Sequence, residues 1–140
     1  MHWPADPHDW LAPKNLLTAW VAENEDSVIG HVALCSAAGD SVALLWSAAS
    51  GLPPESLAAI ARLFVAPSAR GRGLGSALLA EACTEARSRG LCPVLDVLDH
   101  DRCAIALYER TGWRRVASVP APWALASGEQ VLLHYYIAPG

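Results

Sequence analysis

The residues best suited to chemistry in this sequence form a glycine-rich loop, Arg70-Gly71-Arg72-Gly73-Leu74-Gly75-Ser76. The loop follows an apolar segment and opens a segment with helical apolar spacing. A helix N-terminus presents unpaired N–H groups and a partial positive charge. Glycines leave no Cβ in the way of an anion that approaches the backbone. A plain turn would rarely alternate glycines with arginines, so the loop predicts a phosphate or pyrophosphate site.

Two well-known phosphate loops fit this segment poorly. The nucleoside triphosphate loop requires a lysine after its last glycine, but Gly75 is followed by Ser76. The dinucleotide fingerprint G-x-G-x-x-G matches Gly71 and Gly73 but has Ser76 at its last position. Asp96 lies 21 residues after Gly75, near where a ribose-binding acid would stand. Because that fingerprint normally follows the first strand of a longer repeated series, a dinucleotide-binding domain is the weaker alternative.

Apolar spacing and turn residues indicate the elements that must position this loop. We expect strands at 16–23, 28–35, 57–65, 94–98, 113–119 and 131–137, and helices at 42–49, 74–89 and 102–111. The strand–helix–strand crossover in the middle predicts a parallel pair, and the hairpins at each end predict antiparallel neighbours. The expected fold class is therefore α/β (α+β), with a mixed central sheet flanked by helices.

The two long helices have recognisable faces and ends. The inner face of the first is expected to carry Leu74, Leu78, Leu79, Ala82, Cys83 and Ala86, and that of the second Ala104, Leu107, Tyr108 and Thr111. Glu85 and Arg89 form an i,i+4 pair, and Gly90 is a natural residue to follow the helix end. Asp101 is expected to cap the second helix.

Composition excludes several classes of protein. The chain has 140 residues, of which 53% are hydrophobic and 17% charged, so we expect one ordered domain over 1–140 with an N-terminal arm at 1–15. The net charge of −4 disfavours nucleic-acid binding. No apolar run approaches the ~20 residues of a membrane helix, and no secretory signal is expected.

The four cysteines, at positions 35, 83, 92 and 103, form no C-x-x-C pair, which disfavours a metal site. We expect reduced, mostly buried thiols and a cytoplasmic protein. Cys103 is not placed as a nucleophile, because five residues separate it from Tyr108 on the same helix.

Two motifs together resemble the GCN5-related N-acetyltransferase (GNAT) family. Arg70-x-x-Gly73-x-Gly75 matches the pattern R/Q-x-x-G-x-G/A and follows a strand that ends in Val65-x-Pro67. About 30 residues further on stands DRCAIALYERTGW, which begins at Asp101. The resemblance covers roughly residues 16–119 and implies a GNAT-like acyl-CoA N-acyltransferase fold with a shortened N-terminus.

The resemblance implies that acetyl-CoA lies in a gap between two parallel strands, 57–65 and 94–98. The residues that would then bind this cosubstrate are Leu63, Phe64 and Val65 through main-chain atoms, Arg70, Gly71, Arg72, Gly73, Leu74, Gly75 and Ser76 around the pyrophosphate, and Asp101. The family commonly has asparagine where this chain has Asp101, so capping is the safer role for that residue. The Val65 N–H is the implied oxyanion donor.

The implied reaction is direct attack of a primary amine on the thioester in a ternary complex, with no metal. Tyr108 aligns with the family's general acid, which protonates the departing thiolate; otherwise it is a core tyrosine. Transfer needs the neutral amine, and a carboxylate, often acting through water, can remove the proton. Asp96 stands where some members carry a glutamate, and Glu55 and His31 are further candidates.

Only 15 residues precede Leu16, so the first strand and helices of the family are largely missing. In the family those N-terminal helices form one wall of the acceptor pocket. The given start of the sequence could be too late, the arm Met1–Asn15 could replace this wall, or a second subunit could complete it. We expect a homodimer. The acceptor could be a small amine, an aminoglycoside-like antibiotic or a protein amine. A non-catalytic acyl-CoA binding module is the alternative.

Overall fold

The computed structural model describes residues 16–25, 27–38, 43–121 and 131–139, so the N-terminal arm at 1–15 lies outside the described residues. The strands are β1 (Leu16–Asn24), β2 (Ser27–Ser36), β3 (Leu57–Val65), β4 (Cys92–Leu98), β5 (Arg114–Pro120) and β6 (Leu132–Ile137). The helices are α2 (Ala43–Ser50), α3 (Leu74–Ser88) and α4 (Arg102–Arg110), with short 3-10 turns η1 (Pro54–Ser56) and η2 (Pro67–Ala69).

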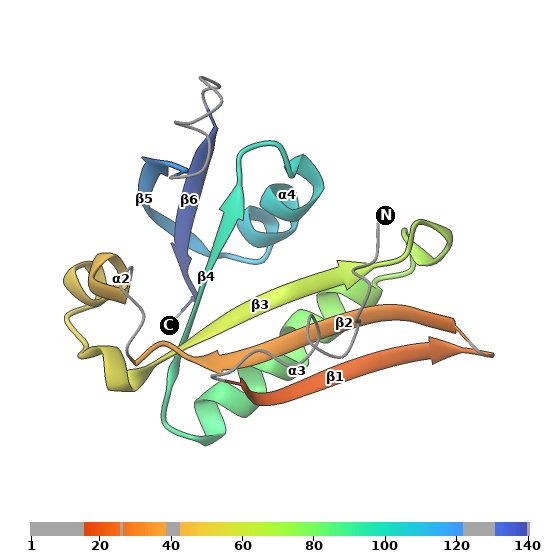
Figure 1. Cartoon of the computed structure of the whole chain (residues 1–140), viewed down its shortest axis with the longest axis horizontal. Coiled ribbons are helices and arrows are strands. Elements are labelled where there is room, and N and C mark those ends of the chain that lie inside the picture. The colour runs from red at the N-terminus through yellow and green to blue at the C-terminus, as the bar shows by residue number, and fades with distance from the viewer. Residues whose placement is uncertain (1–15, 26, 39–42, 122–130, 140) are drawn as a thin grey trace.

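The strands form one mixed sheet in the order β1-β2-β3-β4-β6-β5 (Figure 1). β3 and β4 are parallel, and every other neighbouring pair is antiparallel. The predicted elements, the parallel pair and the two hairpins are therefore confirmed. The structure adds that β6, the last strand of the chain, lies between β4 and β5.

The parallel pair opens after three residues. Leu57–Ala59 pair with Cys92–Val94, and beyond that point β3 and β4 diverge (Figure 1). On its other edge β3 carries a bulge, because His31 and Ala33 of β2 face Phe64 and Ala61. One residue of β3 is thus extra, and Arg62 in the bulge has a φ of 55°. We call the space between the diverging strands the seam.

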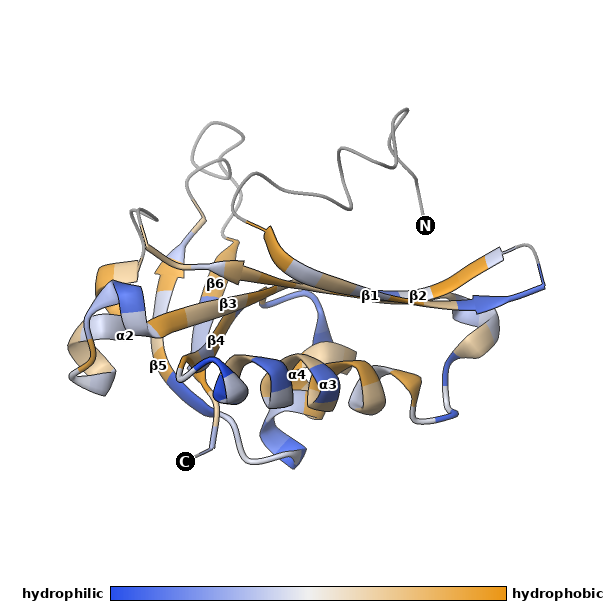
Figure 2. Cartoon of the chain, turned by 90° about the horizontal axis from the view of Figure 1, so that it is seen from below, coloured by the Kyte–Doolittle hydropathy of each residue, from blue (hydrophilic) through white to orange (hydrophobic). Residues whose placement is uncertain are grey.

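Helices cover the two faces of the sheet. α3 and α4 lie on the same face, as the edge-on view of Figure 2 shows. Alternation along β4 puts Leu95 and Val97 in the core beneath these helices and Val94 in a second core on the opposite face. That second core contains Trp46 of α2, whose indole N–H donates to the Leu95 carbonyl at 3.3 Å.

The inner face of α3 is the one predicted, with Leu78, Leu79, Ala82, Cys83 and Ala86 buried. The Glu85–Arg89 pair also forms, at 2.7 Å.

The inner face of α4 differs from the prediction. Ile105 is buried, whereas Thr111 is exposed. Thr111 follows the last residue of the helix, and its hydroxyl donates to the Leu107 carbonyl instead of packing inward.

All four cysteines are unpaired; Cys35 and Cys83 are buried, Cys92 is half-buried and Cys103 is exposed. Burial raises the pKa of the Cys35 and Cys83 thiols. No helix in the described ranges has the length and apolar character needed to cross a membrane.

Candidate functional site

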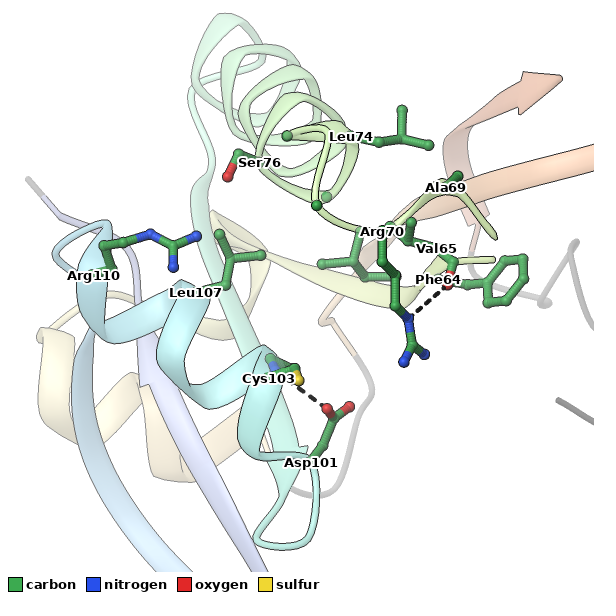
Figure 3. Close-up of a pocket in the computed structure, with 15 residues that line it drawn as sticks. Phe64, Val65, Ala69, Arg70, Leu74, Ser76, Asp101, Cys103, Leu107 and Arg110 are labelled. Atoms are coloured by element: carbon green, nitrogen blue, oxygen red, sulfur yellow. Dashed lines mark hydrogen bonds between the residues drawn. The ribbon is translucent and has the colours of Figure 1, made fainter. Parts of the chain in front are cut away.

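A cavity of about 370 Å³ lies between the end of β3, the start of α3 and one side of α4 (Figure 3). We call it the loop cavity. Of the residues that the sequence assigned to cosubstrate binding, all except Arg72 line it. The further lining residues are Ala69, Cys103, Ala104, Leu107 and Arg110. The sequence analysis missed the α4 members of this set, although Cys103, Leu107 and Arg110 follow helical spacing.

The glycine loop leaves backbone and space available to a ligand. Gly73 precedes α3 with a φ of 76°, and no side chain caps this helix. Its first N–H groups therefore have no side-chain acceptor. Gly71 also has a positive φ, 82°, and a Cβ built on either glycine would have no neighbour within 4 Å. These features fit the pyrophosphate of acetyl-CoA, which needs close approach to main-chain donors.

The open edge of β3 offers main-chain groups to the same ligand. The Ala66 N–H donates to the Ile29 carbonyl of β2 at 2.8 Å. Because successive N–H groups of a strand point to opposite edges, the Val65 N–H is directed toward the seam. The Val65 carbonyl accepts a hydrogen bond from Arg70 Nε at 3.4 Å (Figure 3). The part of β3 beyond Ala59 thus has an edge that β4 does not pair, which fits the amides of pantetheine.

A second cavity of about 380 Å³ occupies the seam, and we call it the seam cavity. Tyr108 of α4, Asp96 of β4 and Leu133 of β6 line it. Side chains alternate along β4, and Leu95 and Val97 belong to the core on the α4 side. The Asp96 side chain therefore leaves β4 on the opposite face of the sheet. Both Tyr108 and Asp96 reach one cavity because the strands between them have separated.

Asp101 and Leu63 line both cavities and therefore mark their junction. Asp101 Oδ1 accepts a hydrogen bond from the Ala104 N–H at 3.2 Å, so the predicted cap of α4 is confirmed. Its carboxylate can cap α4 and at the same time face the seam cavity.

Tyr108 is 5% exposed and packs against the rings of Trp113 and Tyr136. Burial raises the pKa of its hydroxyl well above the ordinary value, and the charges of Asp101 and Asp96 raise it further. No described residue forms a hydrogen bond with this hydroxyl. Tyr108 is therefore protonated at neutral pH and suited to donate a proton or a hydrogen bond into the seam.

The other predicted bases lie elsewhere. His31 is fully buried, and its Nδ1 bonds the Arg62 carbonyl at 2.9 Å, which supports the bulge of β3. Glu55 lies in η1, next to the paired end of β3. Neither residue lines the loop cavity or the seam cavity.

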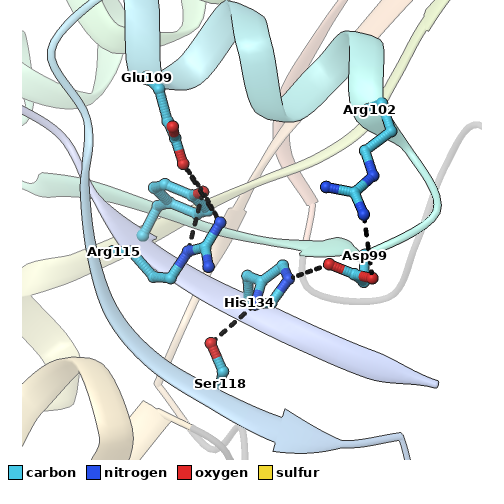
Figure 4. Close-up of polar contacts among 7 residues, drawn as sticks. Asp99, Arg102, Glu109, Arg115, Ser118 and His134 are labelled. Carbon is cyan, nitrogen blue, oxygen red and sulfur yellow. Dashed lines mark hydrogen bonds and ion pairs between the residues drawn. The ribbon is translucent and has the colours of Figure 1, made fainter. Parts of the chain in front are cut away.

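Two polar clusters fasten α4 to β5 and β6 (Figure 4). In the first, the Tyr136 hydroxyl donates to Glu109 at 2.8 Å, and Arg115 bonds both groups. Because Glu109 follows Tyr108 directly, this cluster fixes the helix turn that carries Tyr108.

In the second cluster, His134 lies between Ser118 and Asp99, with both contacts at 2.7 Å. The hydrogen bond with His134 lowers the pKa of Asp99. The sequence analysis found neither cluster, because each joins residues that are distant in the chain.

The sequence profile of the acetyltransferase (GNAT) family matches residues 2–113, and the chain belongs to this family. The dinucleotide-binding alternative is therefore wrong. The chain is also 33% identical over 109 residues to a mycothiol acetyltransferase from Kocuria rhizophila. That match covers 76% of this chain and 32% of the relative, so the chain spans about a third of the relative's length.

Solved structures share the fold at low sequence identity. A protein assigned as a streptothricin acetyltransferase from Bacillus anthracis, crystallised with acetyl coenzyme A, has a TM-score of 0.72 at 16% identity, over 95% of this chain and 68% of that one. The ribosomal-protein-S18-alanine N-acetyltransferase from Escherichia coli has a TM-score of 0.66 at 17% identity, over 99% of this chain and 78% of that one. These similarities confirm the predicted GNAT-like fold.

Proposed function

We propose that this chain transfers an acetyl group from acetyl-CoA to a primary amine by direct attack in a ternary complex. The observation that carries the proposal is the seam, because parallel strands that separate after three paired residues leave main-chain groups for a ligand to bind. The family match supports the same activity. Acetyl-CoA supplies the activated acetyl group, and the chain supplies binding, orientation and proton transfer.

In this proposal the loop cavity holds the donor. The N–H groups around Gly71, Gly73 and Gly75 bind the pyrophosphate, and Arg70 adds positive charge beside them. Leu63, Phe64 and Val65 present the edge of β3 to the pantetheine. The Val65 N–H stabilises the negative charge that develops on the thioester oxygen. Arg72 lies outside the cavity lining and contributes charge from a distance.

Two residues that line the seam cavity, Asp96 and Tyr108, then carry out the proton transfers. Asp96 accepts a proton from the ammonium form of the acceptor, either directly or through water, since only the neutral amine can attack. Tyr108 donates its proton, or a hydrogen bond, to the departing thiolate, and the second proton that the nitrogen loses as the amide forms returns to the Tyr108 oxygen or passes to solvent. The raised pKa of Tyr108 ensures that the proton is present at neutral pH.

The test is release of the CoA thiol from acetyl-CoA over a panel of acceptors. The panel contains small alkylamines, aminoglycosides, and peptides with free N-termini or lysines. Amine-dependent thiol release, with the acetylated amine identified by mass spectrometry, supports the proposal. Tight binding of acetyl-CoA without transfer to any amine would instead favour the alternative, a non-catalytic acyl-CoA binding module.

We further propose a single domain over residues 1–140, a homodimer and a cytoplasmic location. Exposed apolar side chains on the edge strand β1 and on α2, Val21 (48%) and Leu44 (69%), support an interface between copies. The unpaired thiols support a reducing compartment. Light scattering on the purified protein measures the mass, and a monomeric mass at all concentrations would reject the dimer.

A further inference from the structure

One cation of the loop cavity has no role in the reaction just described. Arg110 is the last residue of α4 and lines the cavity together with Leu107 and Cys103, one and two turns earlier. Neither of the two sequence motifs indicates a function for Arg110. The following inference rests on the proposed function, since it concerns the same donor site.

Arg110 is directed into the cavity from the side opposite Arg70. Figure 3 shows its side chain leaving α4 toward the start of α3, where Ser76 lies, while Arg70 extends from the other end. The two arginines therefore place positive charge at two separate ends of one cavity.

No carboxylate of the described residues pairs with Arg110. Its neighbour Glu109 is bound by Arg115 and by the Tyr136 hydroxyl. The described ion pairs of the other arginines join Arg89 to Glu85 and Arg102 to Asp99. The guanidinium of Arg110 is thus available to an external anion.

Coenzyme A carries anionic groups at two separate places, the pyrophosphate and the phosphate on the 3′ position of the ribose. The glycine loop and Arg70 already suit the first. A guanidinium is the side chain whose planar set of donors best matches a phosphate. We propose that Arg110 binds the 3′-phosphate of coenzyme A and so lets the protein distinguish coenzyme A from its 3′-dephospho form.

The test measures binding by isothermal titration calorimetry, with no acceptor amine and no turnover. Coenzyme A and 3′-dephospho-coenzyme A are each titrated into the wild type, Arg110→Ala and Arg114→Ala. Arg114 is the matched control, because it is an exposed arginine four residues away that lines neither cavity. Thermal melting checks that each variant is folded.

We expect the wild type and Arg114→Ala to bind coenzyme A about tenfold more tightly than the dephospho form. Arg110→Ala should lose this preference, because its affinity for coenzyme A falls while its affinity for the dephospho form is unchanged. Arg110→Lys should keep part of the preference, since it retains the charge but loses the planar set of donors.

Two results would overturn this inference and leave the proposed function intact. Equal affinity of the wild type for both nucleotides would show that the 3′-phosphate is not bound. An equal loss of both affinities in Arg110→Ala would place Arg110 on the pyrophosphate instead. Failure of the wild type to bind either nucleotide would overturn the proposed function as well.

Discussion

The loop cavity and the seam cavity adjoin each other but are built differently. The loop cavity is lined by two continuous stretches of chain, residues 63–76 and 101–110. The seam cavity draws on β3, β4, α4 and β6, so its lining includes residues as far apart as Ile60 and Leu133. One cavity depends on local backbone conformation, and the other depends on how the sheet is assembled.

This difference separates binding from chemistry. In the loop cavity, the proposed function assigns acetyl-CoA binding to main-chain groups and glycines, so substitutions should act through affinity. In the seam cavity, the proposed mechanism assigns the proton transfers to the side chains of Tyr108 and Asp96, so substitutions should act through rate. Three substitutions, in order of decreasing effect, test whether the two functions are separable, and a fourth at Asp99, outside both cavities, tests a contact that should affect stability alone.

Tyr108→Phe should give the largest effect, a fall in kcat of about 10²–10³-fold. The ring and its packing remain, while the proton donor is lost. Steady-state kinetics and calorimetry with acetyl-CoA measure the two properties, and the Kd of acetyl-CoA should stay within about twofold. Unchanged turnover would remove Tyr108 from the mechanism, and a large loss of binding would show that the two cavities are not separable.

Asp96→Asn should lower kcat/KM about tenfold at pH 7, and the loss should shrink as the pH rises. At higher pH more of the amine is already neutral, so less depends on the base. A pH–rate profile of the variant and the wild type measures this. Glu55→Gln is the control and should follow the wild type, because Glu55 lies outside both cavities. A loss that is constant with pH would dismiss Asp96 as the base.

Gly73→Ala should weaken acetyl-CoA binding about tenfold, because an alanine held at a φ of 76° costs about 1–2 kcal/mol. The substitution should leave kcat at saturation nearly unchanged. Gly90→Ala is the matched control, since Gly90 has a φ of 73° and equally open surroundings at the other end of α3. It should lose similar stability in thermal melts and keep wild-type affinity. Similar affinities for both variants would show that the glycine loop does not bind the ligand.

Asp99→Asn should give the smallest effect, which appears only in the dependence of stability on pH. The hydrogen bond with His134 lowers the pKa of Asp99 below its ordinary value of 3.8. The stabilisation from the ionised carboxylate is therefore fully present above pH 3.8 and is lost as the pH falls through the lowered pKa. The Tm of the wild type should exceed that of the variant at pH 6, and the two should converge in acid. A difference in Tm that persists in acid would contradict this assignment.

Much of the fold was accessible from the sequence. β3 was predicted to the residue, because Pro53, Pro54 and Pro67 bound an apolar run. The face of α3 followed from its apolar spacing, and the cap of α4 followed from Asp101. The face of α4 was partly wrong, because spacing alone did not separate Ile105 from Thr111 near the helix end. No local sequence pattern indicated that β6 lies between β4 and β5, since strand order depends on pairing between distant segments.

By itself, the sequence determined the loop that precedes α3 and the helix that carries Tyr108. Backbone conformation and helical spacing act over a few residues, so glycines, caps and apolar periods are sufficient to specify them. Only the tertiary structure decided that Asp96 and Tyr108, on opposite faces of the sheet, share one cavity. It also decided that Arg110 lies across the loop cavity from Arg70. Both outcomes depend on where β3 and β4 stop pairing, and that point is set by contacts between segments far apart in the chain.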